Sequence, residues 1–431
     1  MVGEVELAEL MEWAAGEGIT DAPPHSPNSS CLGHSLAISD FPSAGGRGFK
    51  ALRPLKRGDL ILKVPTSALL TTDAVSAADD ALSRALHKHP SLVPSQVRNY
   101  HNTPNPITFQ KLLSVCLLRE HSKGKGSKWH TYLTTIPRRY HLLASFTDSD
   151  IQALQVEDAV YAAQKSRKAA ESQWRGAVAV LEELGMRKKY RSYGAWSWAN
   201  GTVSSRTMHI PWDKAGCLCP VGDFFNYEAP CEDDEGATEG GYEEENGAYC
   251  FYARRDYREG EQVMLCYGTY TNLELLEHYG FVLEGNPCDK VFIPLDGMME
   301  TLAWPRDSLF IHGSGRPSFA LAAELRRSAA VAAERKSIGC LVVSGGLVSA
   351  ENEIRVLRWL GEKCSLVMSG FGSSLEEDER LLGELGEAVD GSDSVERLKL
   401  AVRLRMGHKK AILNCVVYCR EFVGSLQREL I

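Results

Sequence analysis

Two tyrosines, each followed by glycine, stand twelve residues apart in the segment MLCYGTYTNLELLEHYGF (264–281). They form the pairs Tyr267-Gly268 and Tyr279-Gly280, and an apolar-rich stretch separates them. Glycine is common in turns because it adopts backbone angles that other residues avoid. Two such pairs beside one apolar segment predict two phenols held near one another. Such rings suit a narrow channel for an aliphatic stem with a cationic head, or they are core aromatics with satisfied hydroxyls.

Length and composition are those of an ordinary globular protein. The 431 residues allow two or three domains, and 44% are hydrophobic and 24% charged. No run of eighteen apolar residues occurs, so we expect no membrane span. The start, MVGEVELAELMEWAAGEG, is acidic and has the pattern of a helix. We therefore expect neither a signal nor a transit peptide, and a location in the cytoplasm, the nucleus or both.

Negative charge is concentrated in one segment. Residues 228–248 contain nine Asp or Glu and no Lys or Arg, which is more than the whole net charge of −8. This composition is typical of a solvated surface loop, and it would also attract a basic partner. An acidic protein with such a loop is a poor candidate for direct contact with nucleic acid, and we expect none.

The twelve cysteines are irregularly spaced, which fits reduced intracellular thiols. Cys217 and Cys219, with Cys231 and Cys250 further on, have no second close pair and no histidine at ligand spacing. We therefore predict small buried residues and no metal site. The glycines of AGGRG (44–48) are followed by a strand pattern, whereas a dinucleotide-binding loop requires a helix there.

The pattern along the chain alternates between strand and helix. SLAISDF resembles a strand, and so does 60–65, where Leu60, Leu62 and Val64 alternate and Pro65 ends the run. Helical patterns fill 71–196, strand texture returns at SWANGTVSSRTMHIP and continues to about 294, and helices follow to the end. One of these late helices opens with the capping box Ser374–Glu377. The sequence predicts an α+β fold.

Five segments in this order resemble the SET-domain methyltransferases of the Rubisco large-subunit methyltransferase-like class: GGRGFKALRPLKRGDLILKVP, WHTYLTTIP, WANGTVSSRTM, PVGDFFNYEAP and EGEQVMLCYGTYTNLELLEHYGFVLEGNP. The resemblance runs from the first helix to nearly the last residue. It implies a β-rich SET domain interrupted by a helical insert (iSET) and followed by an all-α C-terminal substrate-binding domain. The expected parts are 1–80 (first SET part), 81–195 (insert), 196–294 (second SET part) and 295–431 (C-terminal domain).

The resemblance also implies the cofactor S-adenosyl-L-methionine and the residues that hold it. Arg206 matches the family position that clamps the cofactor carboxylate, for which a guanidinium is suited by its parallel donors. The family's Asp-x-x-Asn-His motif gives Asp223 and Asn226, while Tyr227 stands where the family usually has histidine. At that position the imidazole contacts are lost and a larger ring must fit. The strand expected to lie along the cofactor is Gly46, Arg47, Gly48 and Phe49.

The same resemblance implies roles for the tyrosines of the two Tyr-Gly pairs. Tyr267 matches the family tyrosine at the methyl-transfer point, where we expect it to contact the cofactor, orient the amine and stabilise the transition state. Tyr279 matches the second tyrosine of the channel, and Phe281 is expected to line the substrate site nearby. The zinc-binding cysteine cluster that follows many other SET domains is missing here, since Cys288 stands alone in EGNPCDKVF.

These expectations favour a protein-lysine N-methyltransferase that acts on a non-histone protein, works as a monomer, and binds its protein substrate between the SET and C-terminal helical domains. Two alternatives stay open. One is a protein-histidine N-methyltransferase, because imidazole needs little deprotonation at neutral pH. The other is a non-catalytic protein-binding SET module, for which Tyr227 is the main support.

Overall fold

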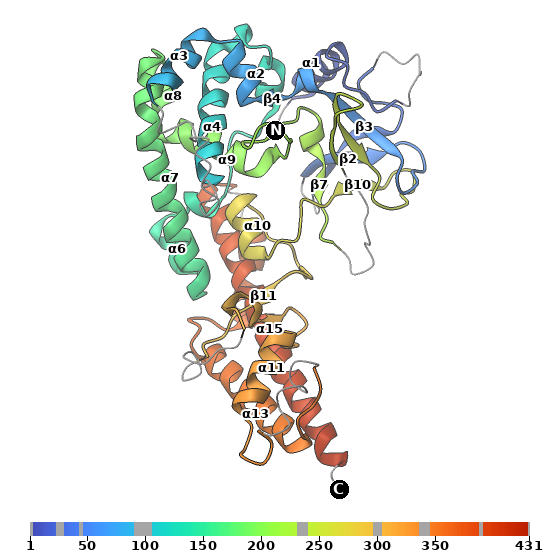
Figure 1. The fold of residues 1–431 in the computed structure, drawn as a ribbon, viewed down its shortest axis with the longest axis vertical. Helices are drawn as coiled ribbons and strands as arrows, with labels where there is room; N and C mark the ends of the chain where they lie inside the picture. The colour runs from blue at the N-terminus through green and yellow to red at the C-terminus, as the bar shows by residue number, and fades with distance from the viewer. Residues whose placement is uncertain are drawn as a thin grey trace. The chain divides into compact units, whose positions relative to one another are not determined.

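A computed structural model describes residues 3–22, 30–42, 46–89, 106–230, 240–295, 304–335, 345–387 and 391–429 (Figure 1). The chain divides into two compact units. The first unit consists of residues 1–145, 165–268 and 278–280, and the second consists of 146–164, 269–277 and 281–431. Helix α7 (Glu157–Glu183) begins in the second unit and continues into the first.

A four-stranded sheet in the first unit carries most of the predicted cofactor residues. Its strand order is β1 (Leu36–Phe41), β2 (Gly46–Ala51), β10 (Gln262–Leu265), β7 (Asn226–Tyr227). Strand β2 is antiparallel to both β1 and β10, whereas β7 runs parallel to β10, with Asn226 opposite Met264. Segments more than 170 residues apart in sequence therefore become neighbours, as the Asn226–Arg47 contact illustrates with its separation of 179 residues.

Two further sheets belong to the first unit. One has the order β3 (Leu60–Pro65), β9 (Ala248–Tyr252), β8 (Gly240–Glu243), and the other β4 (Leu70–Thr71), β6 (Cys217–Leu218), β5 (Thr207–Met208). The predicted strand at 60–65 is confirmed, with Leu62 and Val64 fully buried and Pro65 as the last residue. Cys217, Cys219 and Cys250 are buried free thiols, as predicted, while Cys231 lies outside the described residues.

The first unit also contains the helices α1 (Glu4–Gly16), α2 (Thr72–Ala77), α3 (Asp80–Lys88), α4 (Pro106–Lys123), α5 (His130–Thr135), α8 (Lys188–Arg191) and α9 (Tyr193–Arg206). The apolar stretch of α4, including Leu113 and Leu117, is fully buried. It shares one hydrophobic core with Phe49 of β2 and Trp196 of α9. Burial of apolar surface in this core is the main force that fixes the sheets against the helices.

The strand texture expected from Ser197 onward is wrong for its first ten residues, because α9 continues to Arg206. Ser192 caps the helix by accepting a hydrogen bond from Ala195 N (3.2 Å). Hydroxyl residues at the C-terminal end are accommodated by donating back to carbonyls one turn earlier, as Thr202 does to Trp198 and Thr207 to Val203. These bonds explain why residues with strand preference sit in a helix.

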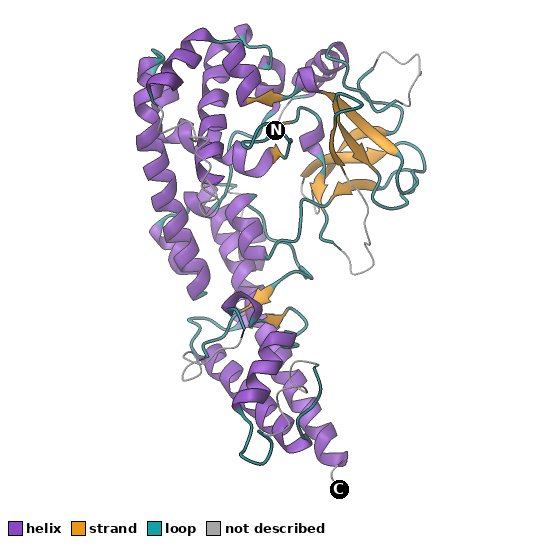
Figure 2. Ribbon diagram, in the orientation of Figure 1, coloured by secondary structure: helices purple, strands orange, loops and turns teal. Residues whose placement is uncertain are grey.

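The second unit is mainly helical, and Figure 2 shows only short strands among its helices. Its elements are α6 (Asp148–Leu154), most of α10 (Asn272–His278), β11 (Lys290–Val291), β12 (Ile311–His312), α11 (Phe319–Ser328), α13 (Ala350–Ser369), α14 (Leu375–Glu387) and α15 (Asp393–Glu429). The predicted capping box of α14 is confirmed: Ser374 N donates to Glu377 (2.7 Å) and Glu377 N to Ser374 Oγ (3.1 Å). None of the described helices has the length and apolar character that crossing a membrane requires.

A buried ion cluster fixes α14 against α15. Asp378 accepts hydrogen bonds from Lys409 Nζ and Arg405 Nη2, both at 2.6 Å, and its side chain and that of Lys409 have no exposed surface. Burial by itself would raise the pKa of Asp378, but the hydrogen bonds from Arg405 and Lys409 outweigh it and the pKa is lowered. The Asp378 carboxylate therefore supplies the negative charge that offsets the burial of the Lys409 and Arg405 cations.

We predict that Asp378→Ala lowers the free energy of unfolding by about 3–5 kcal/mol, because it leaves two buried cations without their partner. Glu379→Ala is the matched control, since Glu379 is the next residue, is half exposed and lies 3.7 Å from Lys410. We expect the control to cost less than about 1 kcal/mol. Thermal and denaturant unfolding measure the stability of both variants. Equal losses of stability would contradict the role given to Asp378 in the buried ion cluster.

Candidate functional site

Glycine at position 48 leaves room for the side-chain ends of two residues on neighbouring strands. A Cβ atom there would lie 2.6 Å from Asn226 Nδ2 and 3.0 Å from Gln262 Nε2, which is too close for any larger residue without movement. Asn226 in turn donates to the main-chain oxygen of Arg47 (3.4 Å). The predicted cofactor strand and the predicted Asn226 therefore lie side by side. Gly46 adopts a positive φ of 77°, which favours glycine at the start of the strand.

Arg206, the last residue of α9, forms an ion pair with Asp223. Its Nη1 donates to Asp223 Oδ2 (2.8 Å) and to the Asp223 carbonyl oxygen (3.0 Å). Burial alone would lower the pKa of Arg206, but the attraction of Asp223 and of two nearby phenols outweighs it and raises the pKa. Arg206 is therefore a permanent cation held in place by the carboxylate.

Arg47 is a second, half-buried cation beside this pair. Its guanidinium lies 4.3 Å from the centre of the Phe224 ring and donates to the carbonyl oxygen of Thr135 (3.0 Å). Burial, followed by repulsion from Arg206, lowers the pKa of Arg47, and Asp223 partly opposes the shift. Two guanidiniums thus share one carboxylate. The resulting excess of positive charge suits an anionic ligand group.

Two phenols outside the predicted set complete the contacts of the ion pair. Tyr132 donates to Asp223 Oδ2 (2.8 Å), and Tyr140 accepts a hydrogen bond from Arg206 Nε (3.3 Å). Both tyrosines occur in or just after the segment WHTYLTTIP, which contributed to the family resemblance without suggesting a role for them. Their type alone gave no signal, because tyrosine at these positions is equally compatible with a core residue.

The predicted proximity of the two Tyr-Gly pairs is confirmed. The ring centroids of Tyr267 and Tyr279 lie 5.2 Å apart, and the ring of Tyr227 lies 5.3 Å from that of Tyr267. Gly268 and Gly280 both have positive φ angles, of 136° and 81°, so each glycine allows a backbone turn that other residues resist. Three tyrosines therefore form one aromatic row.

Hydrogen bonds fix two of these rings. The Tyr267 hydroxyl donates to the carbonyl oxygen of Phe225, and the Tyr227 hydroxyl donates to that of Gly268 (3.0 Å). Each side chain is thus bonded to the main chain within two residues of the other tyrosine. Burial raises the pKa of Tyr267, with Asp223 adding to the shift and Arg206 opposing it. Tyr267 is therefore a neutral phenol whose hydrogen is already donated.

The remaining predicted residues lie as follows. Phe49 is fully buried and its ring meets that of Phe225 at 4.6 Å between centroids, so it supports the site from within the core. Phe281 is half-buried and belongs to the second unit. Of the acidic segment, 231–239 lies outside the described residues, while Glu244 and Glu245 are exposed. No group of three or more His, Cys, Asp or Glu suited to a metal occurs in the part of the chain that is described.

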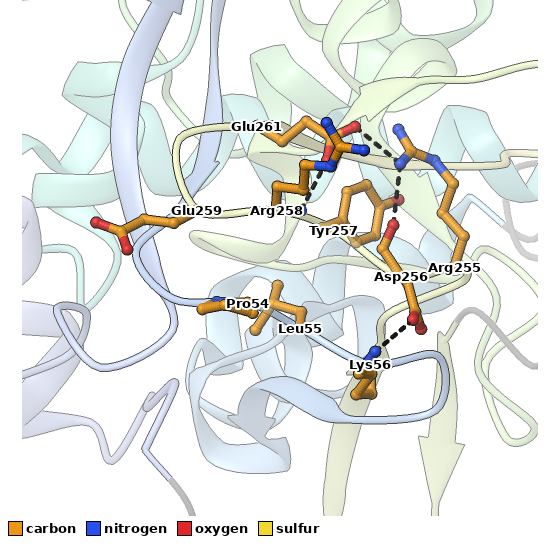
Figure 3. Close-up of a pocket in the computed structure, with 9 residues that line it drawn as sticks. All are labelled: Pro54, Leu55, Lys56, Arg255, Asp256, Tyr257, Arg258, Glu259 and Glu261. Atoms are coloured by element: carbon orange, nitrogen blue, oxygen red, sulfur yellow. Dashed lines mark hydrogen bonds and ion pairs between the residues drawn. The ribbon is translucent and has the colours of Figure 1, made fainter.

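A pocket of about 510 Å³ lies away from these residues, at the turns that join β2 to β3 and β9 to β10 (Figure 3). Four of its charged side chains are paired with one another: Lys56 with Asp256 (2.7 Å) and Arg255 with Glu261 (2.9 Å). None of the predicted site residues lines it.

Family models match two parts of the chain: the SET domain at residues 46–268 and the Rubisco LSMT substrate-binding domain at 321–412. Protein SET DOMAIN GROUP 40 of Arabidopsis thaliana is 43% identical, over 97% of this chain and 96% of that protein. An actin-histidine N-methyltransferase of Papio anubis is 26% identical, over 98% of this chain and 70% of that protein. The chain therefore belongs to the SET-domain methyltransferase family.

A solved structure confirms the fold class. The SET domain of LSMT, described as bound to lysine and AdoHcy, superposes with a TM-score of 0.66 and 18% identity, and the match covers 98% of this chain and 93% of that one. At this identity the likeness concerns the fold: a SET domain with a C-terminal helical substrate-binding domain, as predicted.

The described residues fit the cofactor of this family. Arg206 retains 17% exposure of its side chain, and its Nη2 makes no hydrogen bond to a described residue, so it is able to donate to a carboxylate. The excess positive charge of Arg47 and Arg206 over Asp223 would be neutralised by that group. Gly48 keeps the strand backbone free of a side chain where Asn226 approaches. S-adenosylmethionine supplies an electrophilic methyl group on a sulfonium.

We predict that Gly280→Ala destabilises the protein by more than the 1–2 kcal/mol expected from its positive φ alone. A Cβ atom at Gly280 would also lie 3.3 Å from the backbone of His141, so the turn that carries Tyr279 must shift. Gly260→Ala is the control, because its φ of 85° is similar and open space surrounds it. Denaturant unfolding measures the free energy of unfolding of both variants. A loss in Gly260→Ala as large as that in Gly280→Ala would contradict the packing argument.

Proposed function

We propose that this protein is an S-adenosylmethionine-dependent protein-lysine N-methyltransferase acting on a non-histone protein substrate. Tyr267 and Tyr279 are its catalytic residues, and Arg206 and Asn226 hold the cofactor with the strand Gly46–Phe49. A protein substrate is supported by the match of residues 321–412 to the Rubisco LSMT substrate-binding domain. The proposal for lysine depends mainly on one observation, the hydrogen bond from Tyr267 to the Phe225 carbonyl.

That hydrogen bond leaves the Tyr267 oxygen able only to accept. A neutral lysine amine has N–H groups to donate to such an oxygen while its lone pair points elsewhere. The nitrogen of neutral imidazole that attacks a methyl group carries no hydrogen, because the N–H is on the other ring nitrogen. An acceptor at this point therefore orients an amine and offers nothing to an attacking imidazole.

The amine must be neutral, although the free pKa of lysine is about 10.4. Burial among the rings of Tyr227, Tyr267 and Tyr279 disfavours the ammonium form and lowers that pKa, since desolvation penalises charge. Alignment of the amine by Tyr267 then supplies the near-attack geometry, an effect worth roughly 7–11 kcal/mol in the best intramolecular reactions. The phenol acts by orientation, because its own raised pKa makes it a poor base at neutral pH.

Histidine methylation is the second candidate, and one observation favours it: a relative named as an actin-histidine N-methyltransferase aligns over 98% of this chain. For that reaction the pocket needs an acceptor for the distal N–H of the ring. Lysine methylation and histidine methylation therefore differ in which residue of the substrate protein carries the methyl group after the reaction.

We predict that the wild-type protein transfers labelled methyl groups from S-adenosylmethionine to lysine side chains of proteins in a cell extract. Tyr267→Phe should lower transfer by about 10²-fold, the loss expected when a reacting group is misplaced by about 1 Å, and leave S-adenosylhomocysteine affinity within twofold. Tyr190→Phe is the control, since Tyr190 packs against His121 in the insert. Mass spectrometry of the digested extract locates the label.

Each other outcome has a definite meaning. Label on histidine instead of lysine would replace the proposal by the histidine alternative. Cofactor binding without transfer to any protein would favour a non-catalytic binding module. Full activity of Tyr267→Phe would contradict the role given to its hydroxyl.

A further inference from the structure

We propose that Tyr132 and Tyr140, both contributed by the helical insert, are positioning residues that set the affinity of the site for the cofactor's carboxylate. They act through Arg206 and Asp223, which we call the carboxylate clamp. The inference rests on the cofactor assignment and is independent of whether lysine or histidine is methylated.

The direction of every hydrogen bond around the clamp is fixed by chemistry. Arginine only donates, so the Tyr140 oxygen accepts from Arg206 Nε and its own hydrogen is free. Thr202, one turn before Arg206 on the same helix, donates its own hydroxyl hydrogen to the carbonyl oxygen of Trp198 (2.9 Å). Tyr140 therefore acts on Arg206 as a hydrogen-bond acceptor.

The other side of the clamp is fixed in the same way. An ionised carboxylate only accepts, so Tyr132 donates to Asp223 Oδ2, the oxygen that also receives Arg206 Nη1. Burial and the neighbouring Asp223 raise the pKa of Tyr132, and burial raises that of Tyr140. Both phenols therefore keep their hydrogens at neutral pH, and the pattern of donors does not change.

The packing around Tyr140 leaves it one position. Gly201, on α9, faces its ring so closely that an added Cβ would lie 2.9 Å from Tyr140 Cδ2 and 3.0 Å from its Cβ. A tyrosine ring is not a flexible end group that yields to such a contact. Glycine at 201 thus lets the phenol approach Arg206, which lies one turn further along the same helix.

A guanidinium with free rotation would bind a carboxylate less well, because ordering it costs entropy on binding. Here Nε and Nη1 are already engaged by Tyr140 and Asp223, and the orientation of Nη2 is fixed as a consequence. The insert thereby contributes to cofactor binding without contacting the cofactor, and its two phenols account for much of the preorganisation of Arg206.

Two natural ligands differ in the group that the clamp would recognise. S-adenosylhomocysteine carries the amino-acid carboxylate, whereas 5′-methylthioadenosine has the same nucleoside thioether without it. Tyr132→Phe and Tyr140→Phe remove only a hydroxyl, and Gly201→Ala displaces the Tyr140 ring. Calorimetric titration of each folded variant with both ligands separates an effect on the carboxylate from a general loss of structure.

We expect each variant to bind S-adenosylhomocysteine about tenfold more weakly, as for the loss of a hydrogen bond to a charged group, and to bind 5′-methylthioadenosine within twofold of the wild type. Tyr190→Phe, a phenol of the insert away from the clamp, should change neither affinity. In an Arg206→Ala background, Tyr140→Phe should have no further effect, because the two act on the same ligand group.

An equal loss of affinity for both ligands would show that the two tyrosines have a merely structural role, and it would overturn the inference. An unchanged affinity for S-adenosylhomocysteine would also overturn it. An additive effect in the Arg206→Ala background would overturn it as well. Failure of the wild type to bind S-adenosylhomocysteine would instead overturn the cofactor assignment itself, so the two failures are distinguishable.

Discussion

The buried ion pair between Arg206 and Asp223 is the interaction on which the site depends. The Asp223 side chain is 1% exposed and that of Arg206 is 17% exposed, and removing one partner of a buried pair costs about 3–5 kcal/mol. The pair joins the end of α9 to the segment that leads into β7, and so places Asn226 and Tyr227 beside β2 and β10. One electrostatic requirement therefore fixes elements from three distant parts of the sequence.

The tyrosines at the other end of β7 are held by reciprocal hydrogen bonds. Tyr267 donates to the carbonyl oxygen of Phe225, two residues before Tyr227, and Tyr227 donates to that of Gly268, the residue after Tyr267. Tyrosine in place of the family's histidine thus supplies a hydroxyl that anchors the Tyr267-Gly268 turn. The tyrosine at position 227 keeps the Tyr267 phenol in position, and its ring becomes part of the aromatic row.

Sequence patterns predicted the features that depend on neighbouring residues or on a recurring motif. The strand at 60–65, the capping box at Ser374 and the proximity of the two Tyr-Gly pairs are of this kind. Helix α9 was missed because its hydroxyl residues favour strands in isolation, and only their bonds to earlier carbonyls reveal the helical choice.

Tyr132 and Tyr140 could not be predicted for a different reason. Their partners lie 91 and 66 residues away along the chain, and nothing in the local sequence distinguishes them from core tyrosines. The same holds for the side chain of Arg47, of which only the backbone was expected to take part. Its contact with Thr135 spans 88 residues.

The most direct measurement is a calorimetric titration of S-adenosylmethionine into the wild-type protein and into Arg206→Ala, with folding of both verified by circular dichroism. The account predicts saturable one-to-one binding by the wild type and at least a tenfold weaker affinity in the variant, since a charged hydrogen bond to the carboxylate is lost. Undiminished binding by Arg206→Ala, or no binding by the folded wild type, would contradict it.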